Sequence, residues 1–375
     1  MAGIYLHIPF CKQACHYCDF HFSTSLKHSE DLVKALLAEI KLQEHFLEGE
    51  KINTVYFGGG TPSILKIEAL EEIFDQLHRY FQIAKDAEIT LEANPDDLTA
   101  AYLRKLRHTP VNRLSIGVQS FHEADLKAMN RAHNSAQALR CVPEAADLGF
   151  ENLSIDLIYG IPGSGMQGWQ ENVKQALQLP VDHLSCYCLT VEAGTALAWQ
   201  VKKGLTPAVD EDEAASQFEW LLEITETAGI PWYEISNFSK PGRESRHNTA
   251  YWNGVPYLGV GPSAHSFNGN IRQWNVKNNP VFIREINKGI IPMEKEILTS
   301  LQQFNELILT SLRTRKGLTA ESIRKLGGEE AWKELKEQAS PLAERGQLII
   351  DSENIRVSTK GMLFADALAS SLFKI

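Results

Sequence analysis

Residues 3–20 read GIYLHIPFCKQACHYCDF, and this stretch decides the fold of the chain. Its first six residues form a short apolar and β-branched run, which is typical of a buried strand. The loop that follows holds Cys11, Cys15 and Cys18 in a C-x3-C-x2-C spacing. Three thiolates from one loop can surround a single metal centre, and such soft ligands suit an iron–sulfur cluster or zinc.

The same order of a short strand and a longer amphipathic stretch recurs along the chain. Strands are predicted at 3–8, 53–57, 88–93, 113–118, 153–158, 183–189 and 232–236, and helices at 30–47, 68–81, 99–108, 135–149, 169–177 and 213–229. The strands are apolar on both faces and the crossovers are long, which favours a parallel sheet wrapped by helices. We therefore expect an α/β fold, a full or partial TIM-like (β/α)6 barrel over residues 1–235.

Polar side chains follow several of these strands where each strand ends. YFGGGTP (56–62) ends the second strand and lets the backbone approach a ligand, although glycine clusters also mark ordinary turns. Glu92, Gln119, Arg131 and Asp156 lie at or after the next three strands. In a barrel these ends share one rim, so their recurrence predicts a single ligand pocket.

Zinc is the main alternative to a cluster, with His7, His16 or His21 as the fourth ligand. Structural zinc usually pairs two short knuckles across a longer loop, whereas this chain has one triplet. Three cysteines also leave one iron of a cubane without a protein ligand, so that the open iron can chelate a substrate or cofactor. Unliganded thiols near a barrel mouth are the remaining interpretation.

Composition narrows the classes of function. With 375 residues and 43% hydrophobic residues, the chain can form a large domain and a smaller one. The net charge of −10 makes nucleic acid a poor partner, because phosphate binding needs clustered Lys and Arg. The sequence has no apolar run of the roughly 20 residues that span a bilayer, and no signal peptide is recognisable, so we expect a cytoplasmic protein. In that reducing compartment Cys141, Cys186 and Cys188 are interpreted as core residues.

The last third of the chain predicts further units. Gly, Pro and Asn mark a connecting region at 236–295 beyond the barrel. From 296 to 375, helical patterns surround the hairpin signal LIIDSENIRVS (348–358), which predicts a small helical, winged-helix-like domain. Such domains often bind DNA, but EEAWKELKEQASPLAERG (329–346) mixes charges, so packing or partner docking is expected.

The motif HIPFCKQACHYCDF, with YFGGGTP, LEANP, SIGVQSF, NRAH and SIDLIYGIPG, resembles the radical SAM superfamily, specifically its HemN/HemW branch, over nearly the whole chain. The resemblance implies that the three cysteines of the opening loop hold a [4Fe-4S] cluster whose open iron is chelated by S-adenosylmethionine. It also implies that the following residues line this cofactor: Tyr5, Gly59, Gly60, Thr61, Glu92, Gln119, Arg131 and Asp156. Their chemistry agrees, since Arg131 and Gln119 suit a carboxylate and Glu92 suits an ammonium. The implied reaction is one-electron reduction of the sulfonium, giving methionine and a 5′-deoxyadenosyl radical.

Two kinds of protein share this branch. Oxygen-independent coproporphyrinogen III dehydrogenases oxidise propionate side chains in heme biosynthesis, whereas HemW proteins act as heme chaperones that deliver heme to respiratory enzymes. The dehydrogenase pattern has a further cysteine where this chain has Phe20, and an extension before the cluster motif, which here begins at Cys11. Both departures favour the chaperone.

The segment RHNTAYW (246–252) matches the HNxxYW motif of HemW proteins, in which the histidine is implicated in heme binding. That histidine is His247, and an imidazole is a natural axial ligand of heme iron. His265 is a second candidate. The resemblance implies heme as cargo, apo forms of respiratory enzymes as acceptors, and peripheral membrane contact only through partners. Porphyrinogen oxidation is the alternative, and a redox or structural cluster protein without cofactor turnover is a third interpretation.

Overall fold

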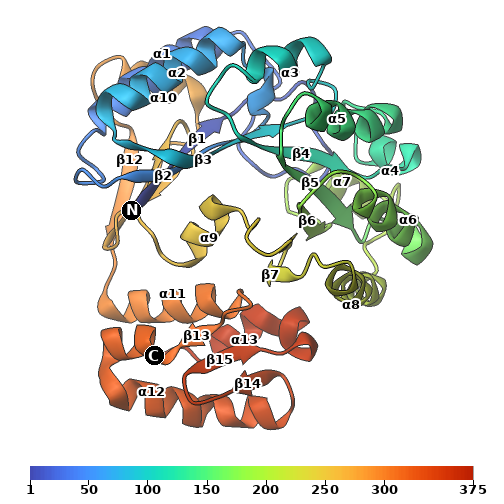
Figure 1. The fold of residues 1–375 in the computed structure, drawn as a ribbon, viewed down its shortest axis with the longest axis vertical. Coiled ribbons are helices and arrows are strands. Elements are labelled where there is room, and N and C mark those ends of the chain that lie inside the picture. The colour runs from blue at the N-terminus through green and yellow to red at the C-terminus, as the bar shows by residue number, and fades with distance from the viewer. Residues whose placement is uncertain (375) are drawn as a thin grey trace.

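Strands and helices alternate along the first half of the chain in the computed structural model, which describes residues 1–374 (Figure 1). The strands are β1 (Ala2–Ile8), β2 (Ile52–Gly59), β3 (Ile83–Ala93), β4 (Arg113–Gln119), β5 (Asn152–Tyr159) and β6 (His183–Cys188). The connecting helices are α1 (Ser29–Leu42), α2 (Ile67–Tyr80), α3 (Ala100–Leu106), α4 (Glu123–Ala128), α5 (Ser135–Asp147) and α6 (Gly165–Leu177). The predicted α/β class with six parallel strand–helix units is confirmed.

The six strands pair in parallel, each with the next along the chain. The side chains of Leu6, Phe57 and Leu91 are fully buried and occupy matched positions on β1, β2 and β3. Because side chains alternate along a strand, Tyr5 and Tyr56, one residue earlier, point to the opposite face. That face is the barrel interior, and both tyrosines line its cavity.

Short strands extend the sheet on both sides of the parallel core. The order is β12-β11-β10-β9-β1-β2-β3-β4-β5-β6-β8-β7. On the β1 side lie β9 (Tyr257–Val260), β10 (His265–Phe267), β11 (Ile271–Asn275) and β12 (Met293–Ile297), and on the β6 side β7 (Trp232–Glu234) and β8 (Asn237–Ser239). The predicted strand at 232–236 is thus a short edge strand, antiparallel to β8. The sheet does not close, because β12 and β7 are its two ends.

Buried Glu39 on α1 forms hydrogen bonds that join the β1 side of this extension to the core. Its carboxylate accepts hydrogen bonds from the backbone N–H of Gly261 (2.7 Å) and from Nδ2 of Asn275 (2.6 Å). Burial raises the pKa of Glu39 to about 7. Four further helices belong to this part of the chain, namely α7 (Ala196–Lys202), α8 (Glu211–Thr227), α9 (Arg246–Trp252) and α10 (Asn279–Ile286). No helix within residues 1–374 is both long and apolar enough to cross a bilayer.

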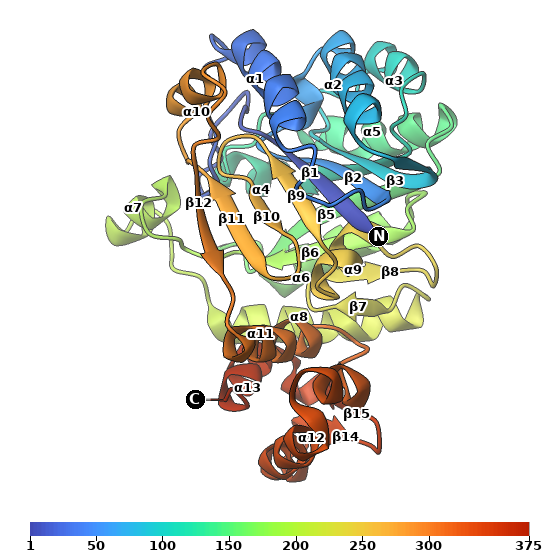
Figure 2. The same ribbon diagram turned by 90° about the vertical axis from the view of Figure 1, so that its left-hand side faces the viewer.

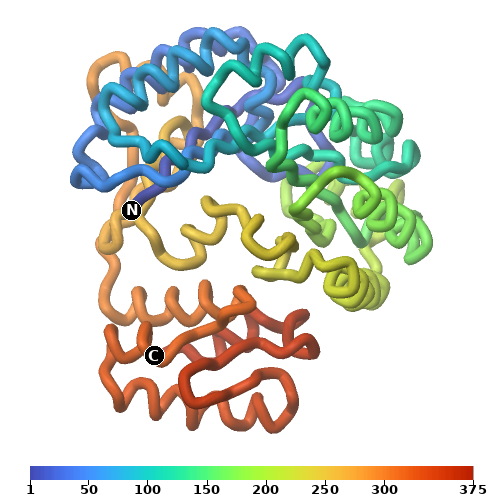
Figure 3. Tube along the Cα trace, in the orientation of Figure 1, coloured from blue at the N-terminus to red at the C-terminus, as the bar shows by residue number. Residues whose placement is uncertain are grey.

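The C-terminal region packs as a separate layer below the barrel (Figure 2). It contains α11 (Ser300–Leu312), α12 (Ala320–Glu344), α13 (Ala365–Ser371) and the antiparallel strands β13 (Leu318–Thr319), β14 (Leu348–Ile350) and β15 (Asn354–Val357). The predicted hairpin is the β14–β15 pair. Trp332 is fully buried among these elements. The chain trace shows α9 between this region and the barrel (Figure 3).

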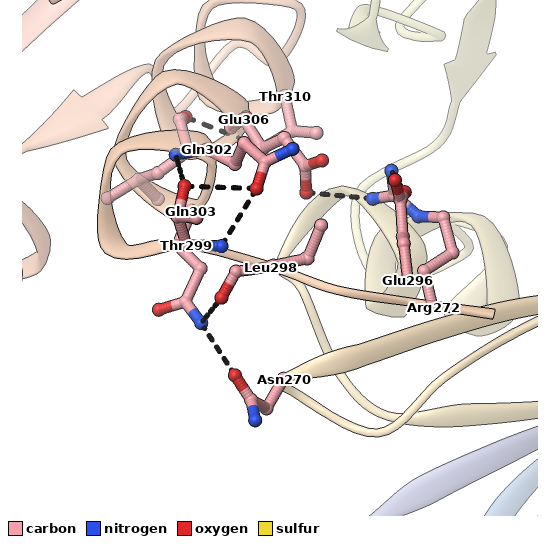
Figure 4. Close-up of polar contacts among 10 residues, drawn as sticks. Asn270, Arg272, Glu296, Leu298, Thr299, Gln302, Gln303, Glu306 and Thr310 are labelled. Atoms are coloured by element: carbon pink, nitrogen blue, oxygen red, sulfur yellow. Dashed lines mark hydrogen bonds and ion pairs between the residues drawn. The ribbon is translucent and has the colours of Figure 1, made fainter.

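Polar contacts join α11 to the sheet extension (Figure 4). The side chains of Thr299 and Gln302 form a capping box that starts the helix. Arg272 on β11 pairs with Glu306 on α11 at 2.7 Å and lies 3.5 Å from Glu296 on β12. The C-terminal region is therefore oriented against the strands that border the barrel opening.

Candidate functional site

The loop after β1 brings the three cysteines of the motif close to the ends of the strands. Cys11, Cys15 and Cys18 are free and partly buried. The Thr61 hydroxyl donates to Cys11 Sγ at 3.5 Å, and Arg131 Nη1 donates to Cys15 Sγ at 3.3 Å. Burial, with a smaller contribution from negative charge on the other two thiols, raises the pKa of Cys18 to about 11. Cys11 and Cys15 therefore lie beside residues that follow β2 and α4.

The geometry favours a cluster over zinc. Within residues 1–374, no three His, Cys, Asp or Glu side chains converge closely enough for a single metal ion. A cubane spreads its ligands over several irons and makes no such demand. The histidines proposed as a fourth zinc ligand are engaged elsewhere: His7 with Tyr5 and the His21 carbonyl, His16 with the Ala128 carbonyl, and His21 with Asn279.

Arg131 and Gln119 meet at the ends of β3 and β4. A Cβ placed on Gly117 would lie 2.9 Å from Gln119 Nε2 and 3.3 Å from Arg131 Nη2, so that the glycine leaves room for both. Gln119 has φ +67°, which aims its side chain out of the strand ladder. Arg131 Nη2 also donates to Asn94 Oδ1 at 2.6 Å, whereas its buried Nε has no partner among the described residues. An unpaired guanidinium donor beside an amide fits a carboxylate ligand.

Glu92 and Tyr5 lie deeper in the barrel. The Tyr56 hydroxyl donates to Glu92 Oε1 at 2.8 Å, and Tyr5 stacks on Tyr56 with ring centroids 6.1 Å apart. Burial raises the pKa of Glu92 to about 7. On β5, Asp156 accepts a hydrogen bond from Ser115 at 3.2 Å, and burial raises its pKa too. A cationic ligand would stabilise the ionised form of both buried carboxylates and would thereby lower both pKa values.

The glycine motif has a role that the sequence did not indicate. The backbone N–H groups of Gly60 and Thr61 donate to the carbonyls of Ile8 and Phe10 at 2.9 and 2.7 Å. A Cβ on Gly60 would lie 2.6 Å from the Phe10 carbonyl oxygen, so only glycine permits this approach. These N–H groups hold the cluster loop against the end of β2. The N–H groups of Gly60 and Thr61 are therefore engaged within the protein.

The donor set therefore fits the cluster and the cofactor that the sequence implies. Thiols, an unpaired guanidinium donor and buried carboxylates surround one rim, as an iron–sulfur cluster and a zwitterionic sulfonium require. When bound, the pair supplies one-electron reductive chemistry. Asn94 and Tyr56 complete the set, and neither was predicted. Asn94 was visible in LEANP, two residues after Glu92.

His247 lies at the opposite end of the barrel strands. Thr54, which pairs with Gly3 near the start of β1, is hydrogen-bonded through Oγ1 to His247 Nδ1 at 2.9 Å. The His247 backbone N–H donates to Glu88 at 3.0 Å, and its ring stacks on Tyr56 at 5.0 Å. No hydrogen-bond partner contacts its Nε2 within residues 1–374. Burial lowers the pKa of His247 to about 4, so the ring is neutral near pH 7.

One cavity of about 1130 Å³ links the cluster loop to His247. Its walls include aromatic side chains from the barrel, α9 and β9, namely Tyr5, Tyr56, Tyr187, Tyr251, Trp252 and Tyr257. Phe20 and His265 also line it, and Phe20 is 69% exposed. Pockets of drug-sized ligands measure roughly 300–1,000 Å³, so this one accommodates a larger molecule.

Comparison with known proteins identifies the family. The profile described as "Radical SAM superfamily" matches residues 5–176, and that described as "HemN C-terminal domain" matches residues 298–364. The protein named "Heme chaperone HemW" from Mycobacterium tuberculosis (strain ATCC 25618 / H37Rv) is 36% identical over 99% of this chain and 94% of its own length. The chain belongs to the HemW family. Family membership in the radical SAM superfamily implies a [4Fe-4S] cluster and S-adenosylmethionine.

Other HemW relatives and one solved structure agree. The "Heme chaperone HemW" of Bacillus subtilis (strain 168) is 34% identical over 94% of each chain. The mitochondrial "Radical S-adenosyl methionine domain-containing protein 1" of Mus musculus is 31% identical over 99% of this chain and 87% of its own. The structure of coproporphyrinogen III oxidase (HemN) from Escherichia coli superposes with a TM-score of 0.86 at 23% identity, over 100% of this chain and 90% of that one. That similarity establishes the fold of this HemW-family chain, not its reaction.

Proposed function

We propose that this protein is a heme chaperone, which binds heme in the barrel cavity and passes it to apo forms of heme-containing respiratory enzymes. His247 carries the proposal. Its ring is neutral, Thr54 fixes Nδ1, and Nε2 has no partner within residues 1–374, which are the conditions that favour an axial iron ligand. The aromatic walls suit the faces of a porphyrin. The names of the HemW relatives support the same function.

The cofactor residues belong to the same proposal. Cys11, Cys15 and Cys18 hold the [4Fe-4S] cluster. Tyr5, Gly59, Gly60, Thr61, Glu92, Gln119, Arg131 and Asp156 line S-adenosylmethionine, with Gly60 and Thr61 acting through the shape of the loop. The protein works in the cytoplasm and reaches the membrane only through its partners.

The experiment is anaerobic reconstitution with iron and sulfide, followed by heme titration of the wild type and His247→Ala. A parallel assay measures turnover of coproporphyrinogen III. We expect stoichiometric heme binding that the substitution weakens, without porphyrinogen turnover. Turnover to protoporphyrinogen with no specific heme binding would instead make the protein a dehydrogenase despite Phe20, and the chaperone proposal would fall.

A further inference from the structure

One wall of the cavity carries a histidine and two of the three Lys and Arg side chains that line it. His265 comes from β10, Arg272 from β11, and Lys277 from the turn between β11 and α10, and all three line the cavity. His21 of the cluster loop adjoins them through its hydrogen bond to Asn279 at the start of α10. The sheet order places this wall on the side of β1 opposite to β3 and β4, which hold Glu92 and Gln119. The wall is therefore apart from Glu92 and Gln119, whereas its Lys277 lies beside the cluster loop.

The cations of the cavity differ in whether they are already neutralised. Arg272 is paired with Glu306 at 2.7 Å (Figure 4), and Arg313 donates two hydrogen bonds to Asp366, at 2.5 and 2.8 Å. Lys277 forms no ion pair with any carboxylate within residues 1–374. Among the described residues, the only polar contact of its ammonium is a long one of 3.5 Å to the Asp19 carbonyl oxygen.

The surroundings of Lys277 lack compensating negative charge. Burial is the main cause that lowers the pKa of His7 and of His21, hydrogen bonds oppose it, and the positive charge of Lys277 lowers both further. The acidic residues of the cavity are held elsewhere, with Glu92 bonded to Tyr56 and Glu234 to Asn237. Asp19 is the exception, because it is exposed and has no such partner among the residues described. Its carboxylate lies more than 4 Å from the Lys277 ammonium. A carboxylate that enters this corner meets a free ammonium and polar imidazoles.

We propose that Lys277 anchors a carboxylate of the cargo, namely a propionate of heme. This inference rests on the proposed heme chaperone function and names how that site recognises its ligand. His247 lies beside the start of β1, whereas Lys277 contacts the cluster loop, which follows the end of β1, and both residues line the same cavity. Heme has its iron at the centre and its carboxylates on one edge, so one ligand can engage both residues from within the cavity.

The test compares ligands that differ only in the carboxylates. The reconstituted full chain is titrated with heme and heme dimethyl ester, and with protoporphyrin IX and its dimethyl ester, which lack iron. The variants are Lys277→Gln, the charge-retaining Lys277→Arg, and Lys295→Gln as a control. Lys295 is an exposed lysine on β12 that does not line the cavity.

We expect the wild type to bind the free acids roughly 5- to 30-fold more tightly than the esters. This preference lies between that expected from an exposed ion pair and that expected from a charge-assisted hydrogen bond. Lys277→Gln should abolish that preference and leave ester affinity unchanged, whereas Lys277→Arg and Lys295→Gln should keep it. The inference is overturned if Lys277→Gln weakens acid and ester equally, or retains the wild-type preference. Failure of the wild type to bind heme and its ester at all would defeat the chaperone function itself.

Discussion

The buried position of His247 predicts an unusual pH profile of heme binding. A proton and iron compete for the same ring nitrogen, so affinity falls as the ring becomes protonated. With a pKa of about 4, the ring is about 90% neutral at pH 5, whereas an exposed histidine of ordinary pKa is only about 3% neutral there. The affinity of the wild type should therefore change less than twofold between pH 8 and 5, where an exposed ligand would lose about 30-fold.

The groups that face this ring support the direction of the shift. Tyr56 stacks on it from β2, Tyr5 faces it from β1, and the Arg113 charge on β4 disfavours its protonation. Glu88 on β3 is engaged by the His247 backbone N–H and carries the only carboxylate hydrogen-bonded to that residue among those described. The assay is an absorbance titration with heme at pH 8, 7, 6 and 5, and His247→Ala at each pH corrects for heme solubility. A tenfold loss per pH unit below 6.5, seen only in the wild type, would refute the reasoning.

Four further substitutions follow from the structure. Cys11→Ala should remove cluster iron and its visible absorption while circular dichroism is retained, and full iron content would contradict the assignment. Arg131→Lys should weaken S-adenosylmethionine binding roughly 10- to 100-fold, since the ammonium cannot reproduce the guanidinium fork; equilibrium dialysis measures this, and unchanged affinity would count against it. Thr54→Val should lower heme affinity about 10- to 100-fold, while Thr54→Ser keeps the hydroxyl and the affinity. Trp332→Ala should reduce the free energy of unfolding by about 3–5 kcal/mol, measured by urea denaturation, and a change below about 1 kcal/mol would show that its burial contributes little.

Much of the barrel and the cluster loop was predictable because the signals are local. Apolar runs mark β1 to β6, and the cysteine spacing lies within eight residues. The strands β9 to β11 of the extension were missed because they are only three to five residues long, and β9 also contains a glycine. Their pairing is also remote, since β9 joins β1 across some 250 residues of chain. A pattern within a short window carries no information about such contacts.

In the candidate site, too, features with a local sequence signal were predictable, and features that depend on remote contacts were not. Glu92, Gln119, Arg131 and Asp156 were predicted because they lie at or after expected strand ends, which share a rim. In the structure Glu92, Gln119 and Asp156 lie within β3, β4 and β5, and Arg131 follows α4. The sequence motif singled out His247 but not its place near the start of β1, which depends on how α9 folds back under the barrel. The lack of an ion-pair partner for Lys277 likewise depends on tertiary distances.

The two unpaired ends of the sheet have a consequence for how cargo moves. A closed eight-stranded barrel encloses a core that is filled by its own side chains and admits ligands only at its mouths. Here β12 and β7 end the sheet without meeting, and α11 supplies Leu309 and Thr310 to the cavity wall instead of a strand. In the proposed function, heme is a flat and rigid ligand, and it can thus pass edge-first through this open side of the barrel. Release to an acceptor then requires side chains at the α11 junction to part, and no backbone hydrogen bond of the parallel core has to break.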